Sequence, residues 1–159
     1  MTPEKIIRDI LEHIFTLQLA TIDADGLPWI CTVCFAADKK NNLYWFSRHD
    51  THHSRHIGQN PRIAGAVATT YQLGDKAQGL QFFGKARDIK TKDELKKGLA
   101  AMCQRYEVSQ EREEKLYTEL SSGKADYGLY GLFPEKIILH DKKNFPKDPQ
   151  KIVETTTKS

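Results

Sequence analysis

The sequence predicts an α+β domain that is built mainly on an antiparallel β-sheet. Strand-forming runs recur between turn residues from position 16 to position 89, whereas helical apolar spacing is concentrated at the N-terminus and between positions 91 and 120. A group of strands followed by a group of helices is typical of α+β folds. Because many short strands would leave exposed edges, we expect the sheet to close into a barrel.

The first expected element is a helix over residues 3–15. Thr2 can cap its first turn, and Pro3 suits the first helical position because its missing N–H has no helical partner there. Apolar residues recur along one face of this helix: Ile6, Ile7, Ile10, Leu11 and Ile14. This apolar face must be buried against the rest of the domain.

Three strands follow, and we expect them to form an antiparallel meander. The first covers residues 16–22 and ends before Asp25 and Gly26, a pair typical of hairpin turns because glycine adopts a positive φ without strain. The return strand covers residues 27–37, and the third strand covers residues 43–47.

A short helix and two more strands come next. Thr51 can cap the helix, which must end before Pro61 because the residue preceding a proline is displaced from the helical region. Residues 63–70 and 80–89 have the composition of two strands, joined by a polar loop.

Two helices are then predicted in succession. Thr91 and Glu94 fit a capping box at the start of the first helix. The second helix covers residues 109–120, and Gly123 can end it in the left-handed conformation.

The last predicted strands are residues 127–133 and 136–140, which return to the sheet. A single domain therefore covers residues 1–141. We expect the polar C-terminal tail, residues 142–159, to be peripheral or disordered.

Composition excludes several classes of protein. The chain has 159 residues, enough for one domain, and its 24 basic and 21 acidic residues are interspersed, which does not indicate a nucleic-acid-binding protein. No apolar run approaches the roughly 20 residues of a membrane-spanning helix. Three cysteines are an odd number that forms no disulfide framework, so the expected location is the cytoplasm.

Cys31 and Cys34 have the spacing of a redox or zinc motif. On a strand, however, residues three apart point to opposite faces, so the two thiols cannot bind one metal ion. We interpret both as packing residues, and we predict no metal site.

Four of the six histidines lie between positions 49 and 56. His52 and His56 share a helical face at a spacing that a metal ion can use, but no third ligand follows at a recognisable distance. The N–H groups at the helix start, the Thr51 hydroxyl, the imidazoles and Arg55 together suit a phosphate. The alternative is an exposed polar helix without a ligand.

Several blocks occur in a fixed order along the chain: residues 20–29 (ATIDADGLPW), 43–47 (LYWFS), 51–53 (THH), 60–62 (NPR) and 79–86 (GLQFFGKA). In their residues and spacing they resemble the pyridoxamine 5′-phosphate oxidase-like, FMN-binding split-barrel superfamily, in particular its small bacterial members. The resemblance implies a split β-barrel with an N-terminal helix, a short helix after the third strand and a helical pair near the C-terminus. It also implies a homodimer that holds FMN between its subunits.

By position, the resemblance assigns eight residues to the cofactor: Cys31, Thr32, Val33, Phe46, Ser47, Thr51, His52 and His53. The oxidase has an arginine and a lysine where this chain has Cys31 and Ala36. His52 and His53 likewise replace an arginine and a lysine, and neutral histidine is a weaker phosphate ligand. Arg48 and Arg55 are the candidates to compensate for this loss of charge.

The leading hypothesis is a homodimeric FMN-binding protein with flavin-dependent oxidoreductase activity on an unknown small substrate. Oxidation of pyridoxamine phosphate itself is not expected. The oxidase has arginines at its substrate-binding end, and these are absent around His140, the corresponding position of this chain. No catalytic acid or base is assigned. Two alternatives stay open: a split-barrel module that holds haem or another flat ligand in place of flavin, and a purely structural or interaction dimer.

Overall fold

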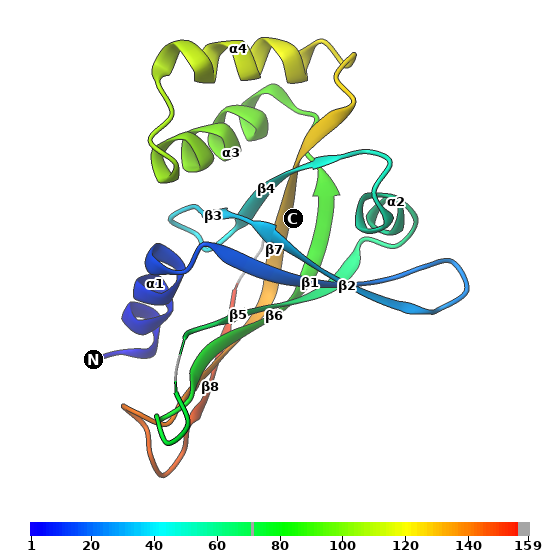
Figure 1. Cartoon of the computed structure of the whole chain (residues 1–159). Coiled ribbons are helices and arrows are strands. Elements are labelled where there is room, and N and C mark those ends of the chain that lie inside the picture. Colours follow the sequence, from blue (N-terminus) through cyan, green and yellow to red (C-terminus); the bar gives the residue numbers. More distant parts are fainter. Residues whose placement is uncertain (71, 156–159) are drawn as a thin grey trace.

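The computed structural model describes residues 1–70 and 72–155 (Figure 1). Its elements are α1 (Pro3–His13), β1 (Thr16–Ile22), β2 (Pro28–Cys34), β3 (Ala36–Ala37), β4 (Leu43–Arg48), α2 (His52–Gln59), β5 (Arg62–Ala68), β6 (Gln78–Asp88), α3 (Lys92–Arg105), α4 (Gln110–Ser121), β7 (Tyr127–Asp141) and β8 (Gln150–Glu154). The short helix and the helical pair therefore occur where the sequence predicts them. None of the described helices is long and apolar enough to cross a membrane.

The eight strands form one antiparallel sheet in the order β2-β1-β5-β6-β7-β4-β3, with β8 paired to β7. The first and last strands of this order, β2 and β3, are separated in sequence by a single residue, Phe35. The sheet must therefore curl until its two ends meet, which makes a split barrel. The predicted α+β class and barrel architecture are confirmed.

The predicted meander is wrong in one respect, because β4 pairs with β7 and β3 and does not pair with β2. Phe35 and Ala36 are both buried, and they pack into different hydrophobic clusters. Two successive buried residues interrupt the alternation of a strand. The predicted strand 27–37 is consequently divided, and its second part, β3, pairs with β4 at the far end of the sheet.

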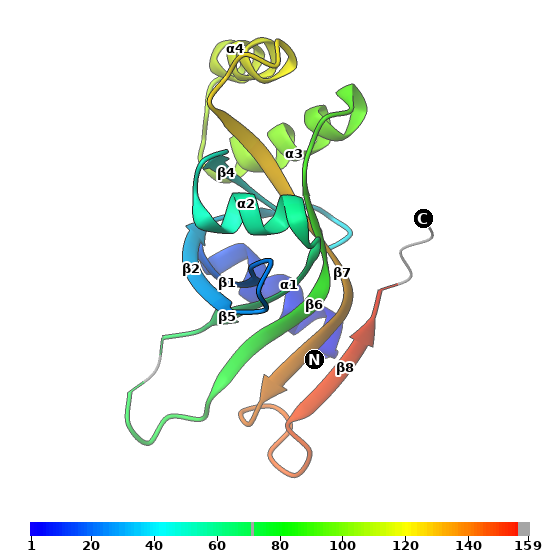
Figure 2. The ribbon, with the colours of Figure 1, turned by 90° about the vertical axis from the view of Figure 1, so that its right-hand side faces the viewer.

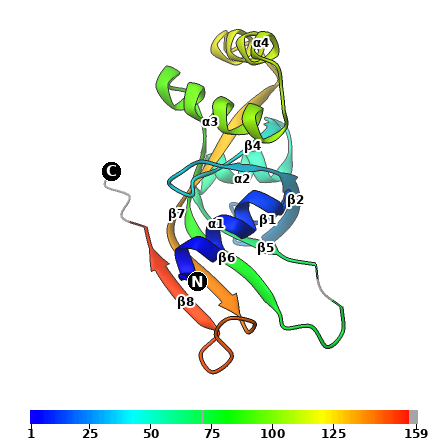
Figure 3. The ribbon, with the colours of Figure 1, turned by 90° about the vertical axis from the view of Figure 1, so that its left-hand side faces the viewer.

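Two hydrophobic cores hold the domain together. The first fills the barrel and includes the apolar face of α1, with Trp45, Phe35 and Phe82 among its largest buried side chains. The second core lies between the helical pair and the strands β4 and β7. It contains Tyr44, Leu99 and other apolar residues of α3 and α4. Figures 2 and 3, which view the molecule from opposite sides, show α2 in front in one and α1 in front in the other. The two helices therefore cover opposite sides of the barrel.

Arg105, at the end of α3, fastens the C-terminus of α1. Its guanidinium donates hydrogen bonds to the carbonyl oxygens of Leu11, Glu12 and Ile14, at 2.9, 2.6 and 2.6 Å. The same group lies 4.2 Å from the centre of the Phe15 ring. These carbonyls have no helical partner, so the arginine supplies the hydrogen bonds that the helix end lacks.

The capping box predicted at Thr91 does not form, because the Thr91 side chain makes no capping hydrogen bond to the helix. Its hydroxyl instead donates to the Glu94 carboxylate at 2.8 Å, and the same carboxylate accepts from Arg87 on the neighbouring strand. The predicted end of α4 is confirmed, since Gly123 has a φ of +68°.

The C-terminal strands differ from the prediction. β7 is one continuous strand that passes through Pro134. The register of its pairing with β6 shifts between Phe83 and Gly84. A Cβ atom at Gly84 would overlap the Phe133 carbonyl, so glycine is required at this irregularity.

Within the predicted peripheral tail, residues 150–154 form an ordered strand, β8, on the edge of β7. Asp141, which is fully buried, accepts hydrogen bonds from the backbone N–H groups of Lys143 and Asn144, both at 2.9 Å, and so reverses the chain. Val153 then packs against the barrel core. The end of the predicted tail, residues 156–159, lies outside the described residues.

Candidate functional site

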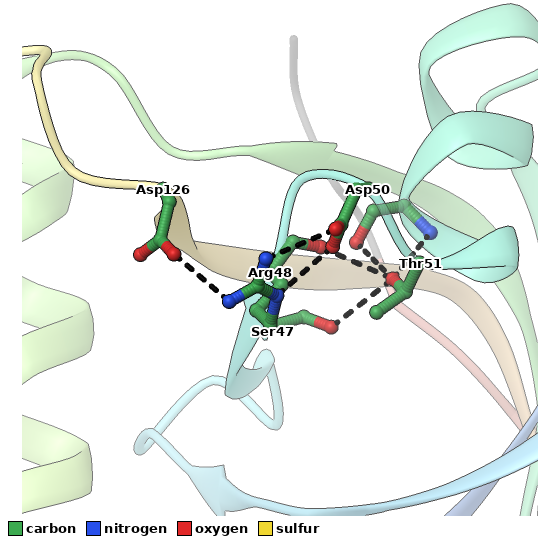
Figure 4. A network of polar contacts seen from close by, with 6 residues as sticks. Ser47, Arg48, Asp50, Thr51 and Asp126 are labelled. Atoms are coloured by element: carbon green, nitrogen blue, oxygen red, sulfur yellow. Dashed lines mark hydrogen bonds and ion pairs between the residues drawn. The ribbon is translucent and has the colours of Figure 1, made fainter.

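The candidate site lies where β4 ends and α2 begins, at one end of the barrel. Thr51 is the N-cap of α2, and its side chain accepts the Ser54 backbone N–H at 3.3 Å, as its position before an eight-residue helix predicts. Thr51 Oγ1 also lies 3.1 Å from the Arg48 carbonyl oxygen and 2.8 Å from Ser54 Oγ. This hydroxyl is therefore at the centre of a compact polar network (Figure 4).

Three of the predicted residues meet at this point: Ser47, Thr51 and His53, which we call the cradle. Ser47 Oγ lies 2.5 Å from His53 Nε2, and Thr51 Oγ1 lies 3.2 Å from the same nitrogen. The two hydroxyl oxygens are 3.4 Å apart. The cradle thus presents two hydroxyls and one imidazole beside the N-terminus of α2.

The prediction that Arg48 compensates for the missing cations is not supported by its contacts, whereas the prediction for Arg55 stays untested. Arg48 forms ion pairs with Asp50 and Asp126, at 3.0 and 2.9 Å, and is thereby neutralised at the surface (Figure 4). Burial, and then the proximity of His56 and His52, lowers the pKa of His53 below its ordinary value of 6.5. At neutral pH the cradle therefore consists of neutral hydrogen-bonding groups.

His52 is separated from the cradle, although it is adjacent to His53 in sequence. Its ring stacks on Trp29 of β2, with the ring centres 4.3 Å apart and the planes inclined by 12°. His56 is buried one turn later, and its Nδ1 lies 3.0 Å from Thr21 Oγ1. The predicted alternative of an exposed polar helix therefore does not describe α2, because His56 is part of the packing.

His52 and His56, the pair with metal-ligand spacing, are neighbours on α2. The rings of His52 and His56 are nearly perpendicular, at 84°, with centres 6.2 Å apart. Within residues 1–70 and 72–155, no group of three or more histidine, cysteine, aspartate or glutamate side chains is placed to hold a metal ion.

The predicted residues of β2 do not share one face of the strand. Cys31 and Val33 are half-buried and pack against the barrel core, whereas Thr32 is exposed. Cys34 is also exposed, and both cysteines are free. Burial raises the pKa of the Cys31 thiol. The two cysteines therefore point to opposite faces, as predicted. The packing role is confirmed for Cys31 and is wrong for Cys34, which is exposed.

Phe46 is likewise separated from Ser47, its neighbour on β4. Its ring packs in the second core, with its centre 6.3 Å from that of Tyr127. Successive residues of a strand point to opposite faces, so Phe46 faces the helical pair and Ser47 faces the barrel end.

A second polar cluster, which the sequence did not indicate, consists of His49, Asp88 and Tyr130. His49 Nδ1 lies 3.1 Å from the Tyr130 hydroxyl and 3.6 Å from Asp88 Oδ2. The three residues come from the end of β4 and from two strands that are far away in sequence. Only the pairing of β7 with both β4 and β6 brings them together.

A groove of about 820 Å³ between α3 and α4 has a different character. Its walls include Leu99, Val108 and Tyr117, with charged residues such as Lys96 and Glu114. Burial raises the pKa of the Cys103 thiol in this groove, so the residue is not an activated nucleophile. The polar groups at the start of α2 are therefore the better candidate site.

An antiparallel sheet closed by β2 and β3, with polar side chains gathered at a short helix after β4, defines a split-barrel protein. The sequence model of the family described as "Pyridoxamine 5′-phosphate oxidase" matches residues 3–141. The chain belongs to this family.

Individual relatives support the same fold. The chain is 27% identical over 86 residues to the UPF0306 protein PM1958 of Pasteurella multocida, a match that covers 54% of this chain and 57% of that protein. A solved heme-binding protein from Mycobacterium smegmatis has a TM-score of 0.75 at 16% identity, covering 98% of this chain and 59% of the other. HutZ, the heme storage protein from Vibrio cholerae, has a TM-score of 0.65 at 24% identity, covering 85% and 92% respectively.

Proposed function

We propose that this protein is a homodimer that binds FMN, and that the cradle holds the FMN phosphate. The observation that carries the proposal is the convergence of Ser47 Oγ, Thr51 Oγ1 and His53 Nε2 beside the start of α2. Hydroxyl and imidazole donors next to a helix N-terminus suit a phosphate. Membership of the oxidase family supports FMN as the molecule that carries it.

The donor set fits a phosphate, but it differs from one built of arginine and lysine. The cradle holds the anion with neutral groups, and binding must favour the protonated form of His53. Bound FMN would supply two-electron chemistry, whereas the side chains described above orient it and hold its charge. Of the other residues assigned to the cofactor by resemblance, Thr32 is exposed, and we propose that it contacts the flavin ring system. Cys31, Val33 and Phe46 pack against the two cores, and we propose that they support this contact.

The outer face of the sheet offers a surface for a second copy of the chain. Ile30, Ala20, Ala64 and Phe83 lie side by side across β2, β1, β5 and β6, each opposite the next in the strand register. Ile30 and Phe83 have 68% and 56% of their surface exposed. An exposed apolar row of this kind favours association, and we propose that it forms the dimer interface. We also propose a cytoplasmic location, since the cysteines are free.

A titration with FMN, followed by the quenching of flavin fluorescence, tests the proposed function. Thr51→Ala should weaken FMN binding at least about tenfold, because the central hydroxyl of the cradle is lost. Ser109→Ala is the matched control, since Ser109 caps α4 in the same way, by accepting the Arg112 N–H, but lies away from the cradle. Unchanged FMN affinity in Thr51→Ala, or a wild-type protein that binds no FMN, would refute the proposal.

Haem is the second candidate ligand. The histidines that begin at His49 favour it, because a neutral imidazole can bind haem iron. The stacked pair of Trp29 and His52 also offers an aromatic surface near the same helix. A titration with hemin, followed by its Soret band, tests this candidate. Binding of neither FMN nor hemin would leave the structural dimer as the function.

A further inference from the structure

Few buried side chains attach α4 to the rest of the domain. Figure 1 shows α4 at the end of the molecule, beyond α3. Only Leu116 of α4 is buried, whereas α3 buries five of its residues. Packing therefore does not close the facing sides of the two helices, and the groove of about 820 Å³ lies between them. A cavity of this size is in the range of small-molecule sites.

The groove combines an apolar lining with an acidic wall. Leu99 and Val108 supply apolar surface from α3 and from the turn before α4. Glu113 and Tyr117 both line the α4 wall, because residues four apart share one face of a helix. Burial, and then the charge of Glu113, raises the pKa of the Cys103 thiol, which lines the groove from α3. The Glu113 carboxylate is therefore on the groove side of α4.

Glu113 is half-buried and has no cation beside it. Both basic residues of α4 are paired with other carboxylates. Arg112 pairs with Glu119 at 3.4 Å, and Lys115 pairs with Glu111 at 3.0 Å. Among the residues that the structure describes, none forms a hydrogen bond or an ion pair with the Glu113 side chain. A half-buried charge without a partner favours the binding of a positive group from solution.

The face of the Tyr117 ring is already occupied by a cation. Lys96 Nζ, which comes from the opposite wall of the groove, lies 5.5 Å from the centre of this ring. Lys96 is exposed, and a flexible exposed lysine is an occupant that a ligand can displace. The ring face and the Glu113 carboxylate, one helical turn apart, both attract positive charge.

We propose that the groove between α3 and α4 binds an organic cation, namely a protonated amine that carries an apolar body. The ammonium group pairs with Glu113 and displaces Lys96 from the face of Tyr117, while the apolar body covers Leu99 and Val108. Two carboxylates and one ammonium group line the groove, so its charge disfavours an anion. The groove shares no residue with the cradle, and the proposal does not depend on FMN.

A titration with 4-phenylbutylamine, followed by the backbone ¹⁵N chemical shifts of α3 and α4, tests the proposal. 4-Phenylbutyrate has the same apolar body and the opposite charge, and it should bind at least about tenfold more weakly. Glu113→Gln should weaken binding of the amine at least about tenfold and bring the two probes closer in affinity. Glu111→Gln is the matched control, since it removes from the same helix a carboxylate that is paired with Lys115. It should change the affinity by about twofold at most.

Two further variants test the place and the displaced lysine. Ala100 is an exposed residue of the α3 wall, so Ala100→Phe should fill the groove without entering the core and should abolish binding of the amine. Circular dichroism checks that its helices are retained. Lys96→Ala should tighten binding of the amine about threefold, because it frees the face of Tyr117.

Each contrary result contradicts a definite part of the proposal. Equal affinities for the amine and the acid, or equal losses in Glu113→Gln and Glu111→Gln, would overturn the selection of a cation. Undiminished binding in a folded Ala100→Phe protein would overturn the groove as the place. Weaker binding in Lys96→Ala would contradict the displacement, and a wild-type protein that does not bind the amine would overturn the whole proposal. Glu113→Gln should retain the FMN affinity of the wild type, so these results leave the proposed function unaffected.

Discussion

Arg105 and Thr51 are each the centre of a polar network, but the two networks connect different parts of the chain. Arg105 binds carbonyl oxygens that lie 91 to 94 positions away, and so joins α3 to the end of α1. Thr51 contacts Ser47, Arg48, His53 and Ser54, all within four positions of it. The first network links distant elements, and the second is confined to one turn of the chain.

This difference separates residues that build the fold from residues that are free to bind a ligand. The hydrogen bonds of Arg105 complete a helix end that would otherwise lack partners, so they contribute to the stability of the whole domain. The groups of the cradle mostly hydrogen-bond to one another. A phosphate can replace these local contacts without separating any two elements of the barrel.

The largest expected effect is on stability, for Arg105→Ala. We expect the free energy of unfolding to fall by about 3 kcal/mol, because three hydrogen bonds from a charged donor and the contact with Phe15 are lost. Urea unfolding measures this effect. Arg87→Ala is the control, since Arg87 also lies over an aromatic ring, at 4.5 Å, but pairs with Glu94 at the surface. Equal losses in the two variants would contradict the role given to Arg105.

The next effect concerns the proposed dimer. Phe83→Asp should weaken dimerisation by about 100-fold, because an unpaired carboxylate would be buried in the interface at one end of the apolar row. Sedimentation equilibrium measures the dissociation constant. Leu73→Asp, in a loop outside the row, should leave the dimer intact. A Phe83→Asp protein that stays dimeric would exclude this face as the interface.

The sequence was sufficient to predict the helices, most strands and the closeness of Ser47, Thr51 and His53, because each depends on residues near one another in the chain. It could not separate His52 from His53, since that depends on the position of Trp29 across the barrel end. Nor could it bring Asp88 and Tyr130 to His49, because their meeting depends on long-range strand pairing. The division of residues 27–37 at Phe35 was not predicted either, because it depends on which strand the second part pairs with.

The separation of the two histidines gives a smaller and more specific prediction. His53→Lys should tighten FMN binding about tenfold, because it places a permanent cation in the cradle. His52→Arg should change the affinity by about twofold at most, since the His52 ring stacks on Trp29. Isothermal titration calorimetry measures both. If His52→Arg produced the larger gain, the phosphate would lie on the Trp29 side of α2.

The smallest effect is a pH dependence of opposite sign for folding and for binding. Because burial lowers the pKa of His53, the unfolded chain takes up a proton that the folded chain resists as the pH falls below 6.5. His53 therefore costs stability in that range, and His53→Asn should remove its share of the loss. A bound phosphate favours protonated His53, so FMN affinity should rise over the same range in the wild type more than in His53→Asn. Thermal unfolding and FMN titration between pH 7.5 and 5 measure the two trends, and identical profiles for both proteins would show that His53 takes no part.

The most direct test of the cradle compares FMN with riboflavin, which has the same ring system and no phosphate. Calorimetric titrations of the wild-type protein should show FMN binding at least about tenfold more tightly than riboflavin, and Thr51→Ala should reduce that ratio towards one. Equal affinity of the wild-type protein for both flavins, or a ratio that Thr51→Ala leaves unchanged, would contradict the assignment of Ser47, Thr51 and His53 to the phosphate.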